Sequence, residues 1–170
     1  MAAQGSGDVG DHTASVVTVS DRVSAGQAED RSGPTAVALL ESSGIRVVEC
    51  RVIPDGVESV SETLSEIAGS VDLIVTTGGT GLTARDLTPE GTKAVLDREA
   101  PGLAEAMRAA TFGKNAHGML SRGVAGTIGR TLVVNLPGSV KGVEESLTVI
   151  LPALTHGLEL LVVGLSDHNA

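Results

Sequence analysis

The sequence predicts an α/β fold, a three-layer sandwich in which a mostly parallel sheet carries helices on both faces and gains a C-terminal hairpin. Short runs rich in β-branched residues alternate with segments of helical periodicity, and turn residues separate them. The chain has 170 residues, of which 41% are hydrophobic, so it is long enough for one domain with a single core. Strands that alternate with helices at this spacing favour parallel pairing and right-handed crossovers.

Three strands and the helices that follow them fill the first two thirds of the chain. We expect strands over residues 14–20, 45–53 and 71–77, where β-branched and other apolar residues follow one another. A long loop over residues 21–31 follows the first strand. Helices are expected from an N-cap at Ser32 to Gly44, over residues 57–68, from a cap at Thr88 to about residue 99, and over residues 101–112.

The last third of the chain predicts a hairpin and a final helix. Residues 124–128 and 131–135 are two extended runs separated by Gly129 and Arg130, which is typical of a hairpin. Helical character then extends over residues 140–163. Residues 1–12 are interpreted as a flexible tail, so we expect the domain over residues 13–165.

The composition excludes several classes of function. Phe112 is the only aromatic residue and the net charge is −9, which disfavours nucleic acid as a partner. Cys50 is the only cysteine, which excludes an intramolecular disulfide, and we expect its thiol in the core. The N-terminal residues lack the basic and apolar stretches of a secretory signal. The apolar segment over residues 150–165 contains Pro152 and is too short to span a bilayer. We therefore expect a cytoplasmic protein without a membrane partner.

Four loops follow predicted strands, at the edge of the sheet where ligands bind in open α/β folds. They cover residues 20–22, 54–56, 76–90 and 135–139. In the third loop, Gly78, Gly79 and Gly81 allow close backbone approach and positive φ. Thr76, Thr77 and Thr80 add hydroxyl groups, and this combination suits phosphate oxygens. The alternative for a glycine-rich stretch after a strand is a simple tight turn.

Two carboxylates stand in these loops and suit a metal site. Asp55 and Asp86 each lie between a predicted strand and a predicted helix, where they could hold a magnesium ion that bridges phosphate oxygens. The alternative role for each is to support a nearby turn or helix N-terminus. The four histidines have no ligand spacing, so a zinc site is not expected.

Further candidate ligands for an anion lie near the C-terminal strand. Pro137 and Gly138 end that strand, and Ser139 can cap the final helix while its first amides stay free for an anion. Ser121 and Arg122 precede the hairpin and could offer a hydroxyl group and a guanidinium fork to a phosphate. A plain capped helix and a solvated arginine are the alternatives.

These motifs together resemble the MogA/MoaB family of molybdopterin-binding proteins, including the related domain of gephyrin. The resemblance rests on EDRSG (residues 29–33), TTGGTGLTARDLTPE (76–90), DREAPGLAEAMR (97–108), LSRGVAG (120–126), TLVVNLPGS (131–139) and LPALTH (151–156). The sequence departs from the family pattern at Gly56, where many members carry an acidic residue, and at Thr155, where proline is usual.

The resemblance implies a function in molybdenum cofactor biosynthesis. It implies a three-layer α/β domain, a homotrimer, and magnesium-dependent transfer of AMP from ATP to molybdopterin, with Asp55 and Asp86 in the nucleotide and metal chemistry. Gly78, Gly79, Thr80 and Gly81 would form the pterin phosphate loop, and Ser139 would match the serine of the NLPGS motif. The product would pass to a molybdenum insertion protein. The alternative is a carrier or scaffold of MoaB type that binds molybdopterin without adenylyl transfer.

Overall fold

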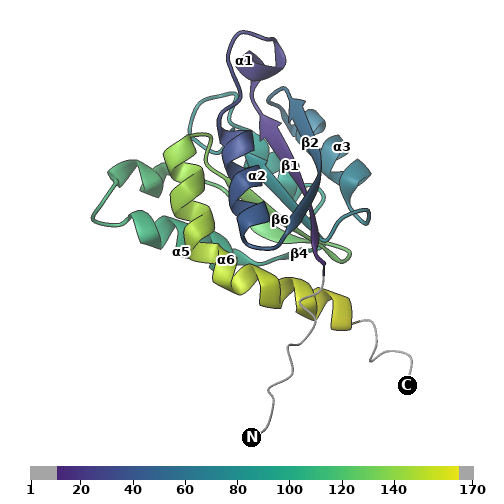
Figure 1. The fold of residues 1–170 in the computed structure, drawn as a ribbon. Helices are drawn as coiled ribbons and strands as arrows, with labels where there is room; N and C mark the ends of the chain where they lie inside the picture. The colour runs from purple at the N-terminus through teal and green to yellow at the C-terminus, as the bar shows by residue number, and fades with distance from the viewer. Residues whose placement is uncertain (1–10, 165–170) are drawn as a thin grey trace, which may run out of the picture.

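The computed structural model describes residues 11–164 and shows one six-stranded sheet between two layers of helices (Figure 1). The expected tail over residues 1–12 therefore lies almost wholly outside the described residues. At its boundary, His12 is buried, and its carbonyl accepts a hydrogen bond of 2.9 Å from the backbone N–H of Arg46. The strands are β1 (Thr13–Val19), β2 (Arg46–Ile53), β3 (Leu73–Thr77), β4 (Arg98–Glu99), β5 (Ala125–Ile128) and β6 (Thr131–Leu136).

The sheet has the order β2-β1-β3-β6-β5-β4. The first four of these strands run parallel, whereas β5 pairs antiparallel with both β6 and β4. The mostly parallel α/β fold and the added hairpin are thus confirmed. Because β1, β2, β3 and β6 are parallel, their carboxyl ends meet at one edge of the sheet, and the loops that follow them lie together.

Helices cover both faces of the sheet, and two separate hydrophobic clusters hold them there. The cluster beneath α2, α5 and α6 is larger than the one beneath α3. The helices are α1 (Asp21–Ser24), α2 (Ser32–Ser42), α3 (Val57–Ile67), α4 (Thr88–Lys93), α5 (Pro101–Thr111) and α6 (Val140–Val163), with a 3₁₀ helix, η1, at Ala116–Leu120.

The last helix, α6, is the one helix among residues 11–164 that is long and apolar enough to cross a membrane, although we expected this region to be too short. Length and composition are weak evidence for a span, because a core helix of this size meets the same criteria.

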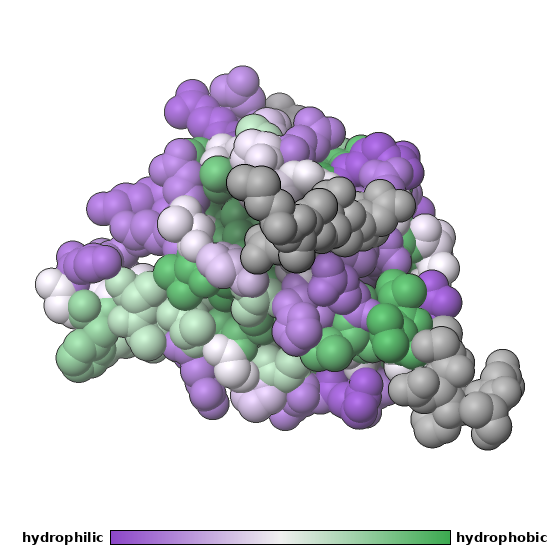
Figure 2. All heavy atoms as spheres, turned by 60° about the horizontal axis from the view of Figure 1, so that its bottom comes forward, coloured by the Kyte–Doolittle hydropathy of each residue, from purple (hydrophilic) through white to green (hydrophobic). Residues whose placement is uncertain are grey.

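Apolar side chains are exposed where α6 ends, including Leu160 and Val162, and on the projecting α5–η1 segment, including Phe112 and Leu120 (Figure 2).

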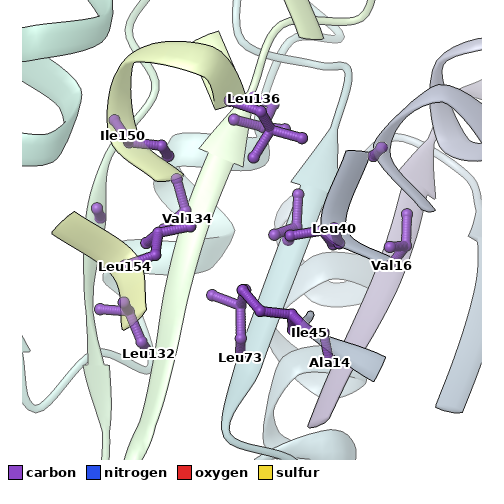
Figure 3. Packing of buried hydrophobic residues seen from close by; sticks show 14 of the residues in the cluster. Ala14, Val16, Leu40, Ile45, Leu73, Leu132, Val134, Leu136, Ile150 and Leu154 are labelled. Atoms are coloured by element: carbon purple, nitrogen blue, oxygen red, sulfur yellow. The ribbon is translucent and has the colours of Figure 1, made fainter. Parts of the chain in front are cut away.

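The inner face of α6 shows why its sequence is apolar (Figure 3). Val143, Leu147, Ile150, Leu154 and Leu158 recur at helical spacing and are at most 1% exposed against the sheet. Burial of each such side chain contributes about 1.5–3 kcal/mol. Because Phe112, the one Phe, Tyr or Trp residue of the sequence, is exposed, aliphatic side chains of this kind form the core.

The structure corrects the expected helix after Thr88. That helix ends at Lys93, and Arg98–Glu99 forms the edge strand β4 beside β5. The pairing requires glycine on the neighbouring strand, because a Cβ at Gly126 would lie 2.3 Å from the carbonyl oxygen of Arg98. Asp97 and Ala100 extend the pairing, since their N–H groups donate 2.8 Å hydrogen bonds to carbonyls of the β5 strand. Tertiary pairing therefore overrides the helical pattern.

Several local expectations are also corrected. The loop over residues 21–31 begins with a short helix, α1, whose N-cap is Ser20. Ser32 lies inside α2, and the amide of Gly33 in the first turn is satisfied by the carboxylate of Asp30, at 2.9 Å. Cys50 is exposed, because β2 is an edge strand.

Candidate functional site

The glycine-rich loop after β3 lies at the carboxyl edge of the sheet and is held by close backbone contacts. Gly78 and Gly79 adopt φ values of +100° and +66°, which glycine tolerates best. A Cβ on Gly78 would lie 2.3 Å from the carbonyl oxygen of Val19, and one on Gly79 would lie 2.3 Å from the hydroxyl oxygen of Thr88. The loop therefore needs glycine both for its conformation and for its packing.

Hydrogen bonds fix this loop to its neighbours. Thr88, expected as a helix cap, instead is the first residue of α4, and its buried hydroxyl donates to the carbonyl of Gly78 at 2.9 Å. The hydroxyl of Thr77 donates to the carbonyl of Pro137 at 2.8 Å. Gly138 also touches the loop, because a Cβ on it would lie 3.1 Å from the Cα of Gly78. The loops after β3 and β6 thus form one packed wall.

Asp55 follows β2 and is half-buried beside the glycine loop. Its Oδ2 accepts a 2.8 Å hydrogen bond from the backbone N–H of Asp21, and its own N–H donates to Oδ1 of Asp21 at 3.0 Å. Its Oδ1 faces Gly79, because a Cβ added to Gly79 would lie 2.9 Å from this oxygen. No residue between 11 and 164 donates a hydrogen bond to this second oxygen.

The electrostatic environment of Asp55 opposes its negative charge. Burial raises the pKa of Asp55, and the nearby carboxylates of Asp21 and Asp86 raise it further. The hydrogen bond from the backbone of Asp21 and the positive charge of Arg85 lower this pKa, but their effect is smaller. The hydrogen bonds from Arg85 instead lower the pKa of Asp21. A cation beside Asp55 would relieve the repulsion among these carboxylates.

Asp86 lies at the far end of the glycine-rich stretch. Its Oδ2 accepts a 2.8 Å hydrogen bond from the N–H of Thr83, so one oxygen supports the turn, as the simpler interpretation of this residue predicts. A Cβ on Gly81 would lie 2.9 Å from the same oxygen. Oδ1 of Asp86, like that of Asp55, has no hydrogen-bond donor among the described residues.

Arg122 has protein partners for its guanidinium group. It donates to the carbonyl of Gly81 at 2.8 Å, to the carbonyl of Asp86 at 2.5 Å, and to the carboxylate of Glu90. These bonds brace both ends of the loop that carries Asp86. The guanidinium of Arg122 also lowers the pKa of Glu90. The geometry makes Arg122 a support of the loop, and the phosphate contact that we expected of it would compete with these bonds.

Two cavities are lined by residues of the glycine loop and of the loop after β6. The first has a volume of about 440 Å³ and extends from the glycine loop to the start of α2. Of the predicted site residues, it is lined by Thr77, Gly78, Gly79, Asp55, Asp86 and Gly138. The second has a volume of about 180 Å³ and is lined by Thr80, Gly81, Ser121, Pro137 and Ser139. Arg122 lines neither of them.

Ser139 acts as the expected helix cap. Its hydroxyl accepts a 3.0 Å hydrogen bond from the N–H of Gly142, at the start of α6. The structure also shows three residues to which the sequence had assigned no role. Asp21 and Arg85 contact Asp55, and Glu90 contacts Arg122. Asp21 stood in a loop expected at the site, but nothing in the sequence indicated its partners.

The two free carboxylate oxygens suit a magnesium ion. Residues 11–164 contain no group of three or more histidine, cysteine, aspartate or glutamate side chains that could hold a metal, so a closed protein cage is absent from this part of the chain. Magnesium is commonly bound by one or two carboxylates together with waters and substrate phosphates. Asp55 and Asp86 offer hard oxygen ligands of that kind in the same cavity.

A parallel sheet with a glycine loop and paired carboxylates at its carboxyl edge defines an α/β domain suited to a phosphorylated ligand. Residues 15–156 match the family model described as a probable molybdopterin binding domain, and the chain belongs to this family. The expected MogA/MoaB relationship is thereby confirmed. It places the chain in molybdenum cofactor biosynthesis.

Named relatives agree with this family. Gephyrin of Dictyostelium discoideum is 42% identical over 157 residues, which cover 86% of this chain but 22% of that longer protein. A molybdopterin adenylyltransferase of Haemophilus influenzae is 40% identical over 136 residues, covering 78% of this chain and 69% of its own. The crystal structure of the molybdopterin biosynthesis enzyme MoaB from Thermus thermophilus superposes with a TM-score of 0.84 at 43% identity, covering 88% of this chain and 96% of that one.

Proposed function

We propose that this protein is a molybdopterin adenylyltransferase that transfers AMP from ATP to molybdopterin with the aid of magnesium. The observation that carries the proposal is the pair Asp55 and Asp86, which line one cavity beside the glycine loop, each with a carboxylate oxygen free of hydrogen bonds from the described residues. Relatives named molybdopterin adenylyltransferase support the same reaction.

The two cavities suit two substrates that meet at a shared wall. The larger cavity, which contains both carboxylates, would hold the phosphates of ATP with magnesium. The smaller cavity, beside Thr80, Gly81 and Ser139, would hold molybdopterin with its phosphate against the glycine loop and the start of α6. The reacting phosphates would then approach each other along Gly78 to Gly81.

The reaction forms one P–O bond and breaks another. An oxygen of the molybdopterin phosphate attacks the α-phosphorus of ATP, the bond between this phosphorus and the bridging oxygen to the β-phosphorus breaks, and pyrophosphate leaves. Magnesium, when bound, neutralises charge on the phosphates. The phosphate oxygen is already a competent nucleophile, so the protein contributes positioning and electrostatic stabilisation through the glycine loop, Asp55 and Asp86.

A carrier or scaffold of MoaB type is the alternative, because a solved relative of similar identity is a MoaB protein. Such a protein needs the binding cavity but not the two carboxylates. Incubation with ATP, magnesium and molybdopterin separates the two functions. Magnesium-dependent release of pyrophosphate together with adenylylated molybdopterin is expected of the enzyme, whereas molybdopterin binding without pyrophosphate release would leave only the carrier.

The proposed enzyme would work in the cytosol as a homotrimer and pass its product to a molybdenum insertion protein. The exposed apolar side chains at Phe112, on η1 and on α6 offer surface for self-association (Figure 2). Light scattering at working concentration is expected to return three times the mass of one chain. A mass near the 17.1 kDa of a single chain would contradict the trimer.

A further inference from the structure

Three loops that are far apart in the sequence are joined around Asp55 by one arginine. Arg85 belongs to the glycine-rich loop and is the residue before Asp86. Its Nε donates to Oδ2 of Asp21 at 2.9 Å, and its Nη2 donates to Oδ1 of Asp21 at 3.2 Å. The same Nη2 donates to the backbone carbonyl of Asp55 at 2.7 Å. A planar guanidinium group can make these contacts at once, whereas an ammonium group cannot reproduce their geometry.

The contacts between Asp21 and Asp55 determine which carboxylate oxygen of Asp55 stays free. The backbone N–H of Asp21 occupies Oδ2 of Asp55, and Oδ1 of Asp21 accepts from the N–H of Asp55. This reciprocal pairing prevents the Asp55 side chain from turning away and leaves Oδ1 beside Gly79. The free oxygen therefore lies on the glycine-loop side of the larger cavity.

Arg85 also connects the two candidate metal ligands through the backbone. Asp86 is its neighbour in the chain, and Asp55 supplies the carbonyl that Arg85 contacts. Arg122 holds the other side of the same loop, through the carbonyls of Gly81 and Asp86. The loop is thus braced from two sides, and the Arg85 contacts fix the separation between the Asp55 and Asp86 loops.

We infer that Arg85 and Asp21 are positioning residues that hold the Asp55 and Asp86 carboxylates at the separation required by a magnesium–nucleotide complex. This inference rests on the proposed function. Neither residue needs to touch the metal, since each acts through Asp55 and through the loop that carries Asp86. Loss of a residue that orients metal ligands typically lowers metal affinity about 10- to 100-fold.

A role in global stability does not account for this arrangement. The side chains of Arg85 and Asp21 are 60% and 42% exposed, and exposed ion pairs contribute little to folding. Removal of the pair should therefore change the melting temperature by less than about 4 °C. A large effect on nucleotide binding with a small effect on stability distinguishes positioning from structural support.

The test compares Arg85→Met and Arg85→Lys with wild type in binding a manganese complex of a non-hydrolysable ATP analogue, measured by calorimetry. The control is Arg51→Ala, because Arg51 also bridges two carboxylates, Glu49 and Glu66, but lines neither site cavity. We expect Arg85→Met to bind the complex at least about tenfold more weakly. Arg85→Lys should fall between Arg85→Met and wild type, and Arg51→Ala should match wild type.

Three further measurements separate the possible outcomes. The molybdopterin affinity and the melting temperature of Arg85→Met should stay near the wild-type values. The double variant Asp21→Ala with Arg85→Ala should lose no more affinity for the nucleotide complex than whichever of the two single variants loses more, because both residues act through the same contacts. Wild-type affinity for the complex in Arg85→Met would overturn the inference, as would a parallel loss of stability and molybdopterin binding. If wild-type protein itself does not bind the complex, the proposed function fails, and the inference fails with it.

Discussion

Gly79→Ala tests whether the glycine loop is held by packing as well as by its backbone conformation. Gly79 has a φ of +66°, and the new methyl group would lie 2.3 Å from the hydroxyl oxygen of Thr88 and 2.9 Å from Oδ1 of Asp55. Thr88 cannot move away without losing its buried hydrogen bond to the carbonyl of Gly78. Asp55 cannot turn freely either, because Asp21 holds its other oxygen.

The cost has two parts. A Cβ in the left-handed region costs about 1–2 kcal/mol. Loss of the Thr88 hydrogen bond, which leaves the carbonyl of Gly78 without its donor, adds about 1–3 kcal/mol. We therefore expect Gly79→Ala to lower the free energy of unfolding by about 2–5 kcal/mol, which a domain of ordinary stability survives. The displaced carboxylate of Asp55 should also weaken binding of the magnesium–nucleotide complex.

Gly129→Ala provides a matched control. Gly129 has a similar φ of +57°, but nothing lies within 4 Å of the position of its Cβ. This variant should lose only the conformational part, about 1–2 kcal/mol, and should bind nucleotide normally. Urea denaturation at equilibrium measures both variants. Equal losses of stability, or unchanged nucleotide binding by Gly79→Ala, would refute the packing argument.

Three other substitutions test separate parts of the structure. Asp86→Asn keeps an oxygen for the turn but removes the negative charge, so turnover should fall about a hundredfold or more. Molybdopterin affinity and melting temperature should stay near the wild-type values. A variant with wild-type activity would contradict the metal role of Asp86. Gly56→Ala should cost about 1–3 kcal/mol in urea denaturation, because Gly56 has a φ of +141°, and a negligible cost would contradict this strain. Arg122 lowers the pKa of Glu90 from its ordinary value of 4.5, so the pair stabilises the fold fully above about pH 4.5, and this contribution disappears as the pH falls through the lowered pKa. Glu90→Gln should therefore be less stable than wild type by under about 1 kcal/mol at neutral pH. Unfolding of both proteins, measured at neutral pH and again in acid, should show that this difference in stability disappears in acid.

The sequence by itself predicted the fold class and the edge of the sheet at which the candidate site lies. Runs of β-branched and other apolar residues indicate β1 to β3, because central strands of a parallel sheet are buried on both faces. Helical spacing of apolar residues indicates the helices after β1 and β2, because one face of each helix packs on the sheet. The parallel order then places the loops after β1, β2, β3 and β6 at one edge. Ser139 was also recognisable, since a helix cap depends only on nearby residues.

Tertiary structure decided the features that depend on distant contacts. The edge strand β4 exists because Gly126 admits the backbone of Arg98, and no local pattern reveals that contact. Arg122 looked available for a phosphate until the structure showed its bonds to Glu90 and to the loop carbonyls. The division of the site residues between two cavities likewise depends on how the loops pack.

Arg85 and Asp21 show most directly what one sequence cannot reveal. They are 64 residues apart, and neither has a local partner that would predict their hydrogen bonds. Their pairing exists because the parallel order of β2, β1 and β3 brings three loops together, and the loop ends then satisfy each other's backbone amides and carboxylates. Residue types and periodicity indicated which loops form the candidate site, whereas only the folded chain determined which side chains hold the two carboxylates in place.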